Sequence, residues 1–359
     1  MKSRKLNIFI SIVIAVFVFS FTSCSKWTDQ ENINYFELPD DAYYEALREY
    51  KASDHQVSFG WFGNWTGTGS SLVNSLIGLP DSVDVISIWS NATSLTEAQY
   101  KDLRFVQKVK GTKVLYCLLI LDIGDGITPK EYMESNETRK AFWGWVDGDN
   151  EAIYSAIRKY ANAIGDTIDK YGYDGFDLDW EPSYAQPFPT NRELAPHDRI
   201  GVLIETLSKR IGPKSRTGRL FVIDGEPANI PKDLGENFDL FISQAYRSSG
   251  ESTLNSRLNS IINYYEGYLT AEEVTNKFVV TENFESVYDA LAGGYNFTDS
   301  QGNKMKSLEG MARWQPSNGF IKGGVGTYHM EAEYPTKPEY KWLRNAIQIM
   351  NPSLNLLIK

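Results

Sequence analysis

Near its middle the chain reads Asp174-Gly175-Phe176-Asp177-Leu178-Asp179-Trp180-Glu181. Four acids interleaved with apolar residues are unusual in a buried segment, because a carboxylate buried without partners costs several kcal/mol. In a β-strand, residues two apart share a face. The octapeptide therefore predicts a strand that carries Asp177, Asp179 and Glu181 in a row on one face and Leu178 and Trp180 on the other.

Neighbouring acids in this row would lie roughly 7 Å apart along the strand, close enough for each to raise the pKa of the next. Such a row suits general acid catalysis near neutral pH. A solvated acidic turn and a calcium loop are the alternatives. Phe176, Leu178 and Trp180 are too apolar for the turn, and the EF-hand spacing, with glycine at loop position six and glutamate at twelve, is absent.

The octapeptide resembles the DGxDxDxE signature of glycoside hydrolase family 18, which includes chitinases and endo-β-N-acetylglucosaminidases, and it matches every fixed position. The resemblance covers about residues 50–350 and implies a reaction in which the substrate's own 2-acetamido oxygen attacks the anomeric carbon. It further implies that Glu181 protonates the glycosidic oxygen and later activates water. Asp179 would orient the acetamide and stabilise the oxazolinium charge, and Asp177 would tune Asp179.

A second stretch, Gln244-Ala245-Tyr246-Arg247, supplies neutral groups for the acetamide. On a strand, Gln244 and Tyr246 share a face and could reach the acetamide carbonyl. Chitinases of the family typically read Met-x-Tyr-Asp here, so Tyr246 carries over while Gln244 and Arg247 depart. The glutamine resembles the endo-β-N-acetylglucosaminidase branch. A solvent-facing strand end is the alternative for Gln244.

Two further departures from the chitinase pattern point the same way. The Ser-x-Gly-Gly turn that follows their third strand is replaced by residues 121–126, and only about 40 residues separate the seventh and eighth predicted strands. That gap is too small for the α+β insertion that deepens chitinase grooves, and a shallower cleft suits branched glycans. Candidate sugar contacts at strand ends, each of which could equally be structural, are Trp61, Trp89, Asn91, Glu282, Asn283 and Tyr328.

Eight apolar, β-rich runs alternate with helical patterns along the chain. The predicted strands are Val57–Trp61, Val83–Trp89, Lys113–Leu121, Gly175–Trp180, Leu220–Ile223, Leu240–Tyr246, Phe278–Thr281 and Gly324–Tyr328. The alternation predicts one α/β domain over residues 53–359, a (β/α)8 TIM barrel with its active site at the carboxyl ends of the strands. Residues 129–149 form an excursion whose Trp143 and Trp145 either line a glycan groove or pack.

Residues 1–23 have the form of a lipoprotein signal peptide. Basic residues precede a 14-residue apolar run, Ile8 to Phe21, which Thr22-Ser23-Cys24 follows. Cys24 is the predicted lipidation site, so we expect a bacterial outer membrane lipoprotein, on the cell surface or facing the periplasm, with residues 24–52 as tether and lead-in. An ordinary signal cut elsewhere and an uncleaved anchor are the alternatives.

Composition excludes several classes of function. The net charge of −10 becomes about −13 once the three basic leader residues are removed, and such a surface repels nucleic acid. The three histidines lack zinc-ligand spacing, so we expect no metal and no cofactor. Cys117 lies in an apolar run and is expected to be a buried, inert thiol. Nine Trp and 21 Tyr favour carbohydrate stacking, although most of these rings will be core.

The sequence therefore predicts a monomeric, retaining endo-β-N-acetylglucosaminidase that cleaves the GlcNAc-β-1,4-GlcNAc core of N-glycans. A chitinase acting on chito-oligosaccharides is one alternative. A non-catalytic glycan-binding lipoprotein is another, although its usual mark, loss of the final glutamate or the middle aspartate, is absent. The type of glycan, whether high-mannose, hybrid or complex, depends on loop shapes that the sequence leaves open.

Overall fold

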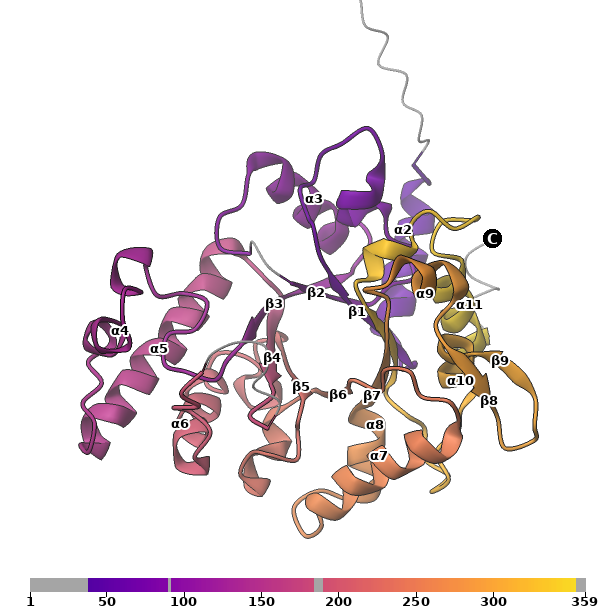
Figure 1. Ribbon diagram of the computed structural model, residues 1–359. Helices are drawn as coiled ribbons and strands as arrows, with labels where there is room; N and C mark the ends of the chain where they lie inside the picture. The colour runs from indigo at the N-terminus through magenta and orange to yellow at the C-terminus, as the bar shows by residue number, and fades with distance from the viewer. Residues whose placement is uncertain (1–37, 90–91, 184–189, 353–359) are drawn as a thin grey trace, which may run out of the picture. The chain divides into compact units, whose positions relative to one another are not determined.

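The computed structural model describes residues 38–89, 92–183 and 190–352. Its centre is a closed barrel of parallel strands in the order β1-β10-β7-β6-β5-β4-β3-β2 (Figure 1). The barrel strands are β1 (Val57–Phe62), β2 (Val85–Ile88), β3 (Lys113–Leu119), β4 (Gly175–Trp180), β5 (Leu220–Gly225), β6 (Leu240–Ser243), β7 (Phe278–Asn283) and β10 (Gly324–Tyr328). The predicted (β/α)8 barrel is confirmed.

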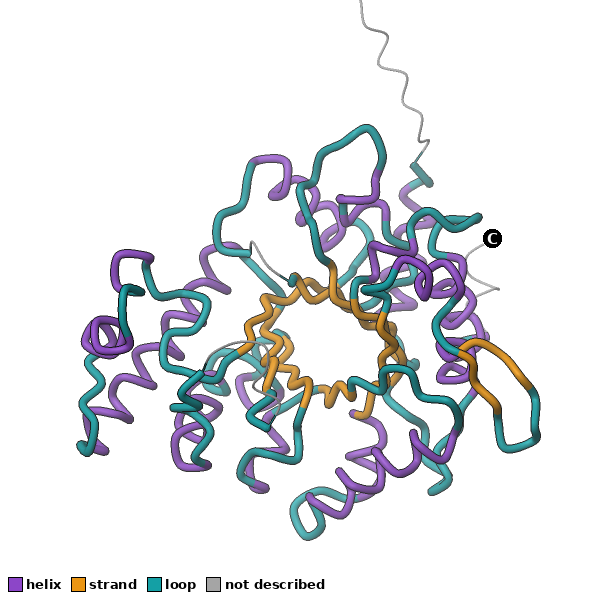
Figure 2. Tube along the Cα trace, in the orientation of Figure 1, coloured by secondary structure: helices purple, strands orange, loops and turns teal. Residues whose placement is uncertain are grey.

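Helices surround this ring of strands (Figure 2). They are α2 (Asp41–Ala52), α3 (Glu97–Lys108), α4 (Asn136–Trp143), α5 (Asn150–Tyr171), α6 (His197–Leu207), α7 (Glu251–Tyr264), α8 (Ala271–Lys277), α9 (Val287–Ala292), α10 (Ser307–Arg313) and α11 (Lys341–Met350). Capping boxes at Thr96, Ser135 and Thr270 fix where α3, α4 and α8 begin. After β5 the connection contains a 3-10 helix, Lys232–Asn237, which Pro231 precedes.

The stretch between β7 and β10 contains elements that the sequence pattern did not predict. Besides α9 and α10, it holds a two-stranded antiparallel sheet of β8 (Asn296–Thr298) and β9 (Lys304–Lys306). The segment is thus filled by two short helices and a hairpin. It does not hold the larger α+β insertion, for which the sequence spacing was too short. The sheet lies outside the barrel (Figure 1).

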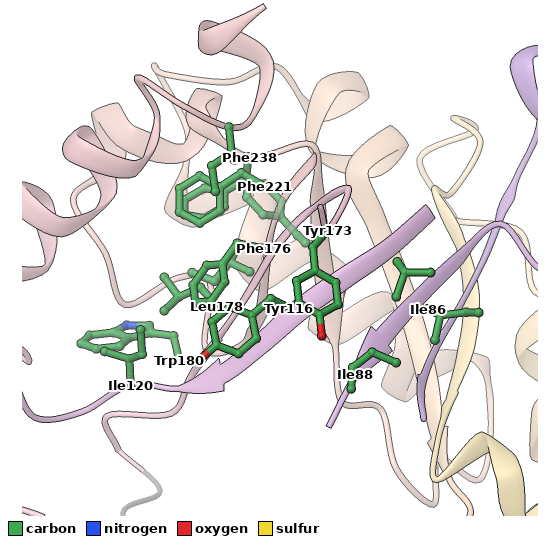
Figure 3. Packing of buried hydrophobic residues seen from close by; sticks show 14 of the residues in the cluster. Ile86, Ile88, Tyr116, Ile120, Tyr173, Phe176, Leu178, Trp180, Phe221 and Phe238 are labelled. Carbon is green, nitrogen blue, oxygen red and sulfur yellow. The ribbon is translucent and has the colours of Figure 1, made fainter. Parts of the chain in front are cut away.

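The buried apolar residues form two layers, one between the strands and the helices and one inside the barrel. Phe176, Leu178 and Trp180 are fully buried in a cluster that also includes residues of the surrounding helices. In Figure 3 Phe176 lies next to Phe221, which lies next to Phe238, while Trp180 lies at the other end of the group beside Ile120. A second cluster, made of strand residues alone, fills the inside of the barrel and includes Phe59, Trp61, Val85, Leu115, Cys117, Val222, Leu240, Ile242 and Val279. The acids of β4 have the parity that turns them toward this inner layer.

Asp174, just before β4, fastens the barrel rather than joining the row of acids. Its Oδ2 accepts hydrogen bonds from the backbone N–H of Val114 (2.9 Å) and from Nε2 of Gln107 (2.7 Å). Because its parity is opposite to that of Asp177, this aspartate ties β4 to β3 and α3 from outside.

The excursion after β3 packs its tryptophans instead of displaying them. Trp143 and Trp145 are only 4% and 5% exposed. The indole N–H of Trp143 donates to Oγ1 of Thr128 (2.9 Å), and that of Trp145 donates to Asp147 (2.8 Å). These two rings therefore pack inside the protein and do not line a glycan groove.

The predicted signal peptide and the lipidation site at Cys24 lie outside the described residues and stay predictions. Helix α2 occupies most of the described part of the predicted lead-in and buries Tyr44, Leu47 and Tyr50. Across residues 38–89, 92–183 and 190–352, no helix combines the length and the apolar character that a membrane crossing requires.

Candidate active site

Four acids gather at the carboxyl ends of β4 and β5. Asp177 and Asp179 lie on the inner face of β4, Glu181 follows directly after the strand with the same parity, and Asp224 lies beside Asp179 in the register of β5. One oxygen each from Asp179, Glu181 and Asp224 lie within 4.8 Å of one another. The predicted row of inward-facing acids is therefore present, and a neighbouring strand extends it.

Asp177 is the deepest of the four and is fully buried. Its Oδ2 accepts hydrogen bonds from Nε1 of Trp61 (2.9 Å) and from Oγ of Ser87 (2.5 Å). Burial raises the pKa of Asp177 to about 6, while these two donors act in the opposite direction. Strands β1 and β2 thus hold this carboxyl group in a fixed position under the other acids.

Asp179 and Glu181 occupy the outer part of the row. Burial, and then the charges of Glu181 and Asp177, raise the pKa of Asp179 well above its ordinary value. Burial also raises the pKa of Glu181, a hydrogen bond with Gln244 lowers it, and the charge of Glu226 raises it. Acids this close together resist joint ionisation, which suits Glu181 to hold and deliver a proton.

Asp224 is a site residue that the sequence interpretation missed. The predicted fifth strand stopped at Ile223, whereas β5 continues to Gly225 and turns Asp224 inward with the same parity as Val222. Its Oδ1 accepts a hydrogen bond from Nε2 of Gln244 (2.9 Å). The sequence did contain a signal for it: residues two apart on a strand share a face, so an acid two residues after the apolar Val222 would face the barrel interior.

The chain turns sooner after β6 than the sequence predicts, since the strand ends at Ser243 and not at Tyr246. The N–H of Ala245 donates to the carbonyl of Ser243 (2.7 Å), and Arg247 has a positive φ of 58°. Gln244 and Tyr246 therefore reach the site from a turn. The hydrogen bond to Asp224 excludes the solvent-facing alternative for Gln244.

Four aromatic residues form a wall at the mouth of the barrel, here called the aromatic wall: Trp61, Trp89, Tyr246 and Tyr328. The ring centroid of Tyr328 lies 6.0 Å from those of Trp61 and Trp89 and 6.1 Å from that of Tyr246, against which it is stacked. Within the wall, Trp61 is 2% exposed and forms the buried base, while Trp89 and Tyr328 are half-buried. Such rings bind the apolar faces of sugars, and sugar contact by these residues stays a prediction.

The remaining predicted sugar contacts lie on and after β7 and β2. Glu282 is fully buried, and its Oε1 accepts the backbone N–H groups of Arg247 (2.8 Å) and Asn283 (2.7 Å). It thereby clamps the turn that carries Tyr246. The Oδ1 of Asn283 accepts the N–H of Glu285 (2.7 Å), and Asn91 lies outside the described residues.

Two groups of side chains in the described ranges could offer three ligands to a metal ion. They are Asp179 with Glu181 and Asp224, and Cys117 with Asp177 and Asp224. Metal ligands must be deprotonated, and burial raises the pKa of every member of both groups. The arrangement favours proton transfer, while the expectation that no metal is bound stays a prediction.

The surroundings of Glu181 predict how activity changes with pH. A general acid works below its pKa, so kcat/KM should fall as pH rises through the raised pKa of Glu181. In Gln244→Leu the hydrogen bond that lowers this pKa is lost, and the alkaline limb should move to higher pH. In Glu226→Gln a repelling charge is lost, and the limb should move to lower pH. Profiles of kcat/KM against pH check both; shifts in the same direction would contradict the assignment.

Comparisons with known proteins agree with this geometry. The model of the family "Glycoside hydrolase family 18, BT1044-like" matches residues 28–349. Endo-β-N-acetylglucosaminidase F2 of Elizabethkingia meningoseptica is 29% identical over 326 residues, which cover 85% of this chain and 85% of that protein. A solved structure of BT1044 in selenomethionine form, with a glutamate-to-glutamine change, is 35% identical with a TM-score of 0.75, over 88% of this chain and 94% of that one.

A more distant structure shares the fold. The endo-β-N-acetylglucosaminidase of Cordyceps militaris in its apo form is 23% identical, with a TM-score of 0.61, over 88% of this chain and 98% of that one.

Proposed function

Since the chain belongs to glycoside hydrolase family 18 and is a glycoside hydrolase, we propose that it is a retaining endo-β-N-acetylglucosaminidase that cleaves the GlcNAc-β-1,4-GlcNAc core of N-glycans. The observation that carries the proposal is the inward row of Asp177, Asp179 and Glu181 with Gln244 beside it. A row of this kind lets an N-acetyl sugar perform its own displacement. The names of the relatives above support the choice of substrate.

In the first step, Glu181 donates its proton to the glycosidic oxygen. The bond from that oxygen to the anomeric carbon breaks while the acetamido oxygen of the same sugar bonds to that carbon. The leaving sugar departs as an alcohol, and the positive charge of the oxazolinium ion lies next to Asp179. No carboxylate of the enzyme becomes bonded to the sugar.

In the second step, the Glu181 carboxylate takes a proton from a water molecule that attacks the anomeric carbon from the side that the leaving group vacated. The bond to the acetamido oxygen breaks and the acetamide is restored. Two inversions at one carbon give net retention. Glu181 ends the cycle protonated, as it began.

Several groups keep the acetamide in place during both steps. Asp179 accepts its N–H, and Gln244 and Tyr246 bond to its oxygen. Asp177, held by Trp61 and Ser87, keeps its negative charge beneath Asp179. The aromatic wall supplies stacking surface for the sugar ring.

Incubating the full chain with one high-mannose and one complex glycoprotein tests the proposal. We expect free glycans that end in a single GlcNAc and protein that keeps the other GlcNAc on asparagine, both measured by mass spectrometry. Proton NMR at early times should show the β-anomer first. Cleavage of chito-oligosaccharides without glycan release would make the enzyme a chitinase, and binding without cleavage of either would make it a glycan-binding protein.

A further inference from the structure

Asp224 is a buried acid that takes part in neither step of the proposed reaction. It is fully buried at the carboxyl end of β5, directly beside Asp179. Its Oδ1 accepts a hydrogen bond from Gln244, but its Oδ2 has no donor, and neither has Oδ1 of Asp177 or Oδ1 of Asp179. Buried oxygens without donors are costly, so three of them at one place need an explanation.

A proton on Asp224 supplies one donor, which accounts for its own Oδ2 and for one oxygen of a neighbouring aspartate. A carboxylate oxygen only accepts hydrogen bonds, whereas a protonated carboxyl group also donates one. Asp224 belongs to both close groups of ligand atoms, the one with Asp177 and Cys117 and the one with Asp179 and Glu181. Its carboxyl group is therefore the one that lies within reach of both neighbouring aspartates.

The other acids are less suited to keep this proton. Asp177 already accepts two hydrogen bonds, which stabilise its anion. Asp179 must accept the acetamide N–H and balance a positive charge, so it works as an anion. Burial and the charges of Asp179 and Asp177 raise the pKa of Asp224, although its hydrogen bond with Gln244 acts in the opposite direction.

We propose that Asp224 remains protonated through the reaction and is a positioning residue for the acetamide: its Oδ2–H donates to Asp179, and its Oδ1 holds Nε2 of Gln244. The proposal rests on the proposed function, in which Asp179 and Gln244 bind that group. Asp224 thereby fixes which oxygen of Asp179 faces the substrate and how the amide of Gln244 is turned. The titratable groups that face it are Cys117, Asp177, Asp179, Glu181 and Tyr246.

Two substitutions of similar size separate a protonated Asp224 from an essential anion. Asparagine offers one acceptor and one donor, like a protonated carboxyl group, so Asp224→Asn should keep kcat within about threefold of the wild-type value. Leucine offers neither, so Asp224→Leu should lower kcat by about 10²-fold with a smaller change in KM. A loss in Asp224→Asn as large as that in Asp224→Leu would overturn the proposal.

Asp239→Asn is the matched control. Asp239 lies at the opposite end of the same strand pair, just before β6, and its Oδ2 accepts the N–H of Phe221 (2.7 Å). Its neutralisation should leave kcat and KM at wild-type values. If Asp224→Leu does not fold, the comparison of Asp224→Asn with Asp239→Asn still decides between the two states of Asp224.

Infrared spectroscopy tests the proton without any substrate. The difference spectrum between wild-type protein and Asp224→Asn at pH 7 should show the loss of a protonated carboxyl band. Loss of a carboxylate band in its place would overturn the proposal. The two proposals can fail separately. If the wild-type protein releases no glycan, but the difference spectrum still shows loss of the protonated carboxyl band, the proposed function fails while the assignment of the proton stands.

Discussion

Replacing Glu181 by glutamine is expected to lower glycan release by about 10³-fold or more while leaving glycan binding intact. Glutamine keeps the size of the side chain and its hydrogen bonding toward Gln244, but it has no proton to give to the glycosidic oxygen. The ground-state contacts of the sugar with the aromatic wall and with Tyr246 do not involve that proton. The loss should therefore appear in kcat.

Release is measured by mass spectrometry, and binding of an intact N-glycopeptide is measured by calorimetry. Glu226→Gln is the control, because Glu226 accepts hydrogen bonds from the N–H of Ser183 and from Asn229 and affects proton transfer only through its charge near Glu181. This variant should stay within about tenfold of wild type at its own pH optimum. Normal turnover by Glu181→Gln would refute the assignment of the acid.

The second large effect is expected from Asp179→Asn, which should reduce kcat by about 10²-fold to 10³-fold. The amide cannot balance the charge of the oxazolinium ion, and it presents a donor where the acetamide N–H needs an acceptor. Affinity for the uncharged substrate depends less on this charge, so KM should change little.

The comparison with Asp224→Asn makes this prediction specific. The two aspartates are register partners on adjacent strands, and both are almost completely inaccessible to solvent. Neutralising Asp179 is expected to lower kcat strongly, whereas neutralising Asp224 is expected to be tolerated. Steady-state kinetics on one labelled high-mannose glycopeptide measure both variants, and equal losses would show that the total charge of the cluster matters rather than the role of each acid.

How far the sequence predicts this fold depends on how local each signal is. The bounds of β4 and β10 agree with the prediction because apolar alternation and the flanking turn residues mark both ends. The predicted end of β6 was wrong. The chain turns at Ala245 because Glu282 on β7 accepts a hydrogen bond from the N–H of Arg247, a contact between distant segments. Short elements such as α8 and the β8–β9 hairpin have too few residues to show a period.

The candidate site was predictable to a similar extent. A motif with several acids at fixed spacing identifies Asp177, Asp179 and Glu181, whereas Asp224 is a lone acid whose meaning comes from its neighbour in the barrel. Whether Trp143 and Trp145 are buried or exposed depends on how α4 packs on α5, and no local sequence pattern predicts that packing. Contacts between distant segments are therefore the part that required a structure.

The hydrogen bond from Trp61 to Asp177 links positions 116 apart in the chain, from the first strand to the fourth. The deepest carboxyl group of the row consequently acquires its partners only when the sheet closes on itself. Fragments lacking the first two strands, or chains that have not finished folding, would display the whole acidic octapeptide and yet be catalytically silent. Enzymatic competence in this molecule is thus a reporter of completed folding.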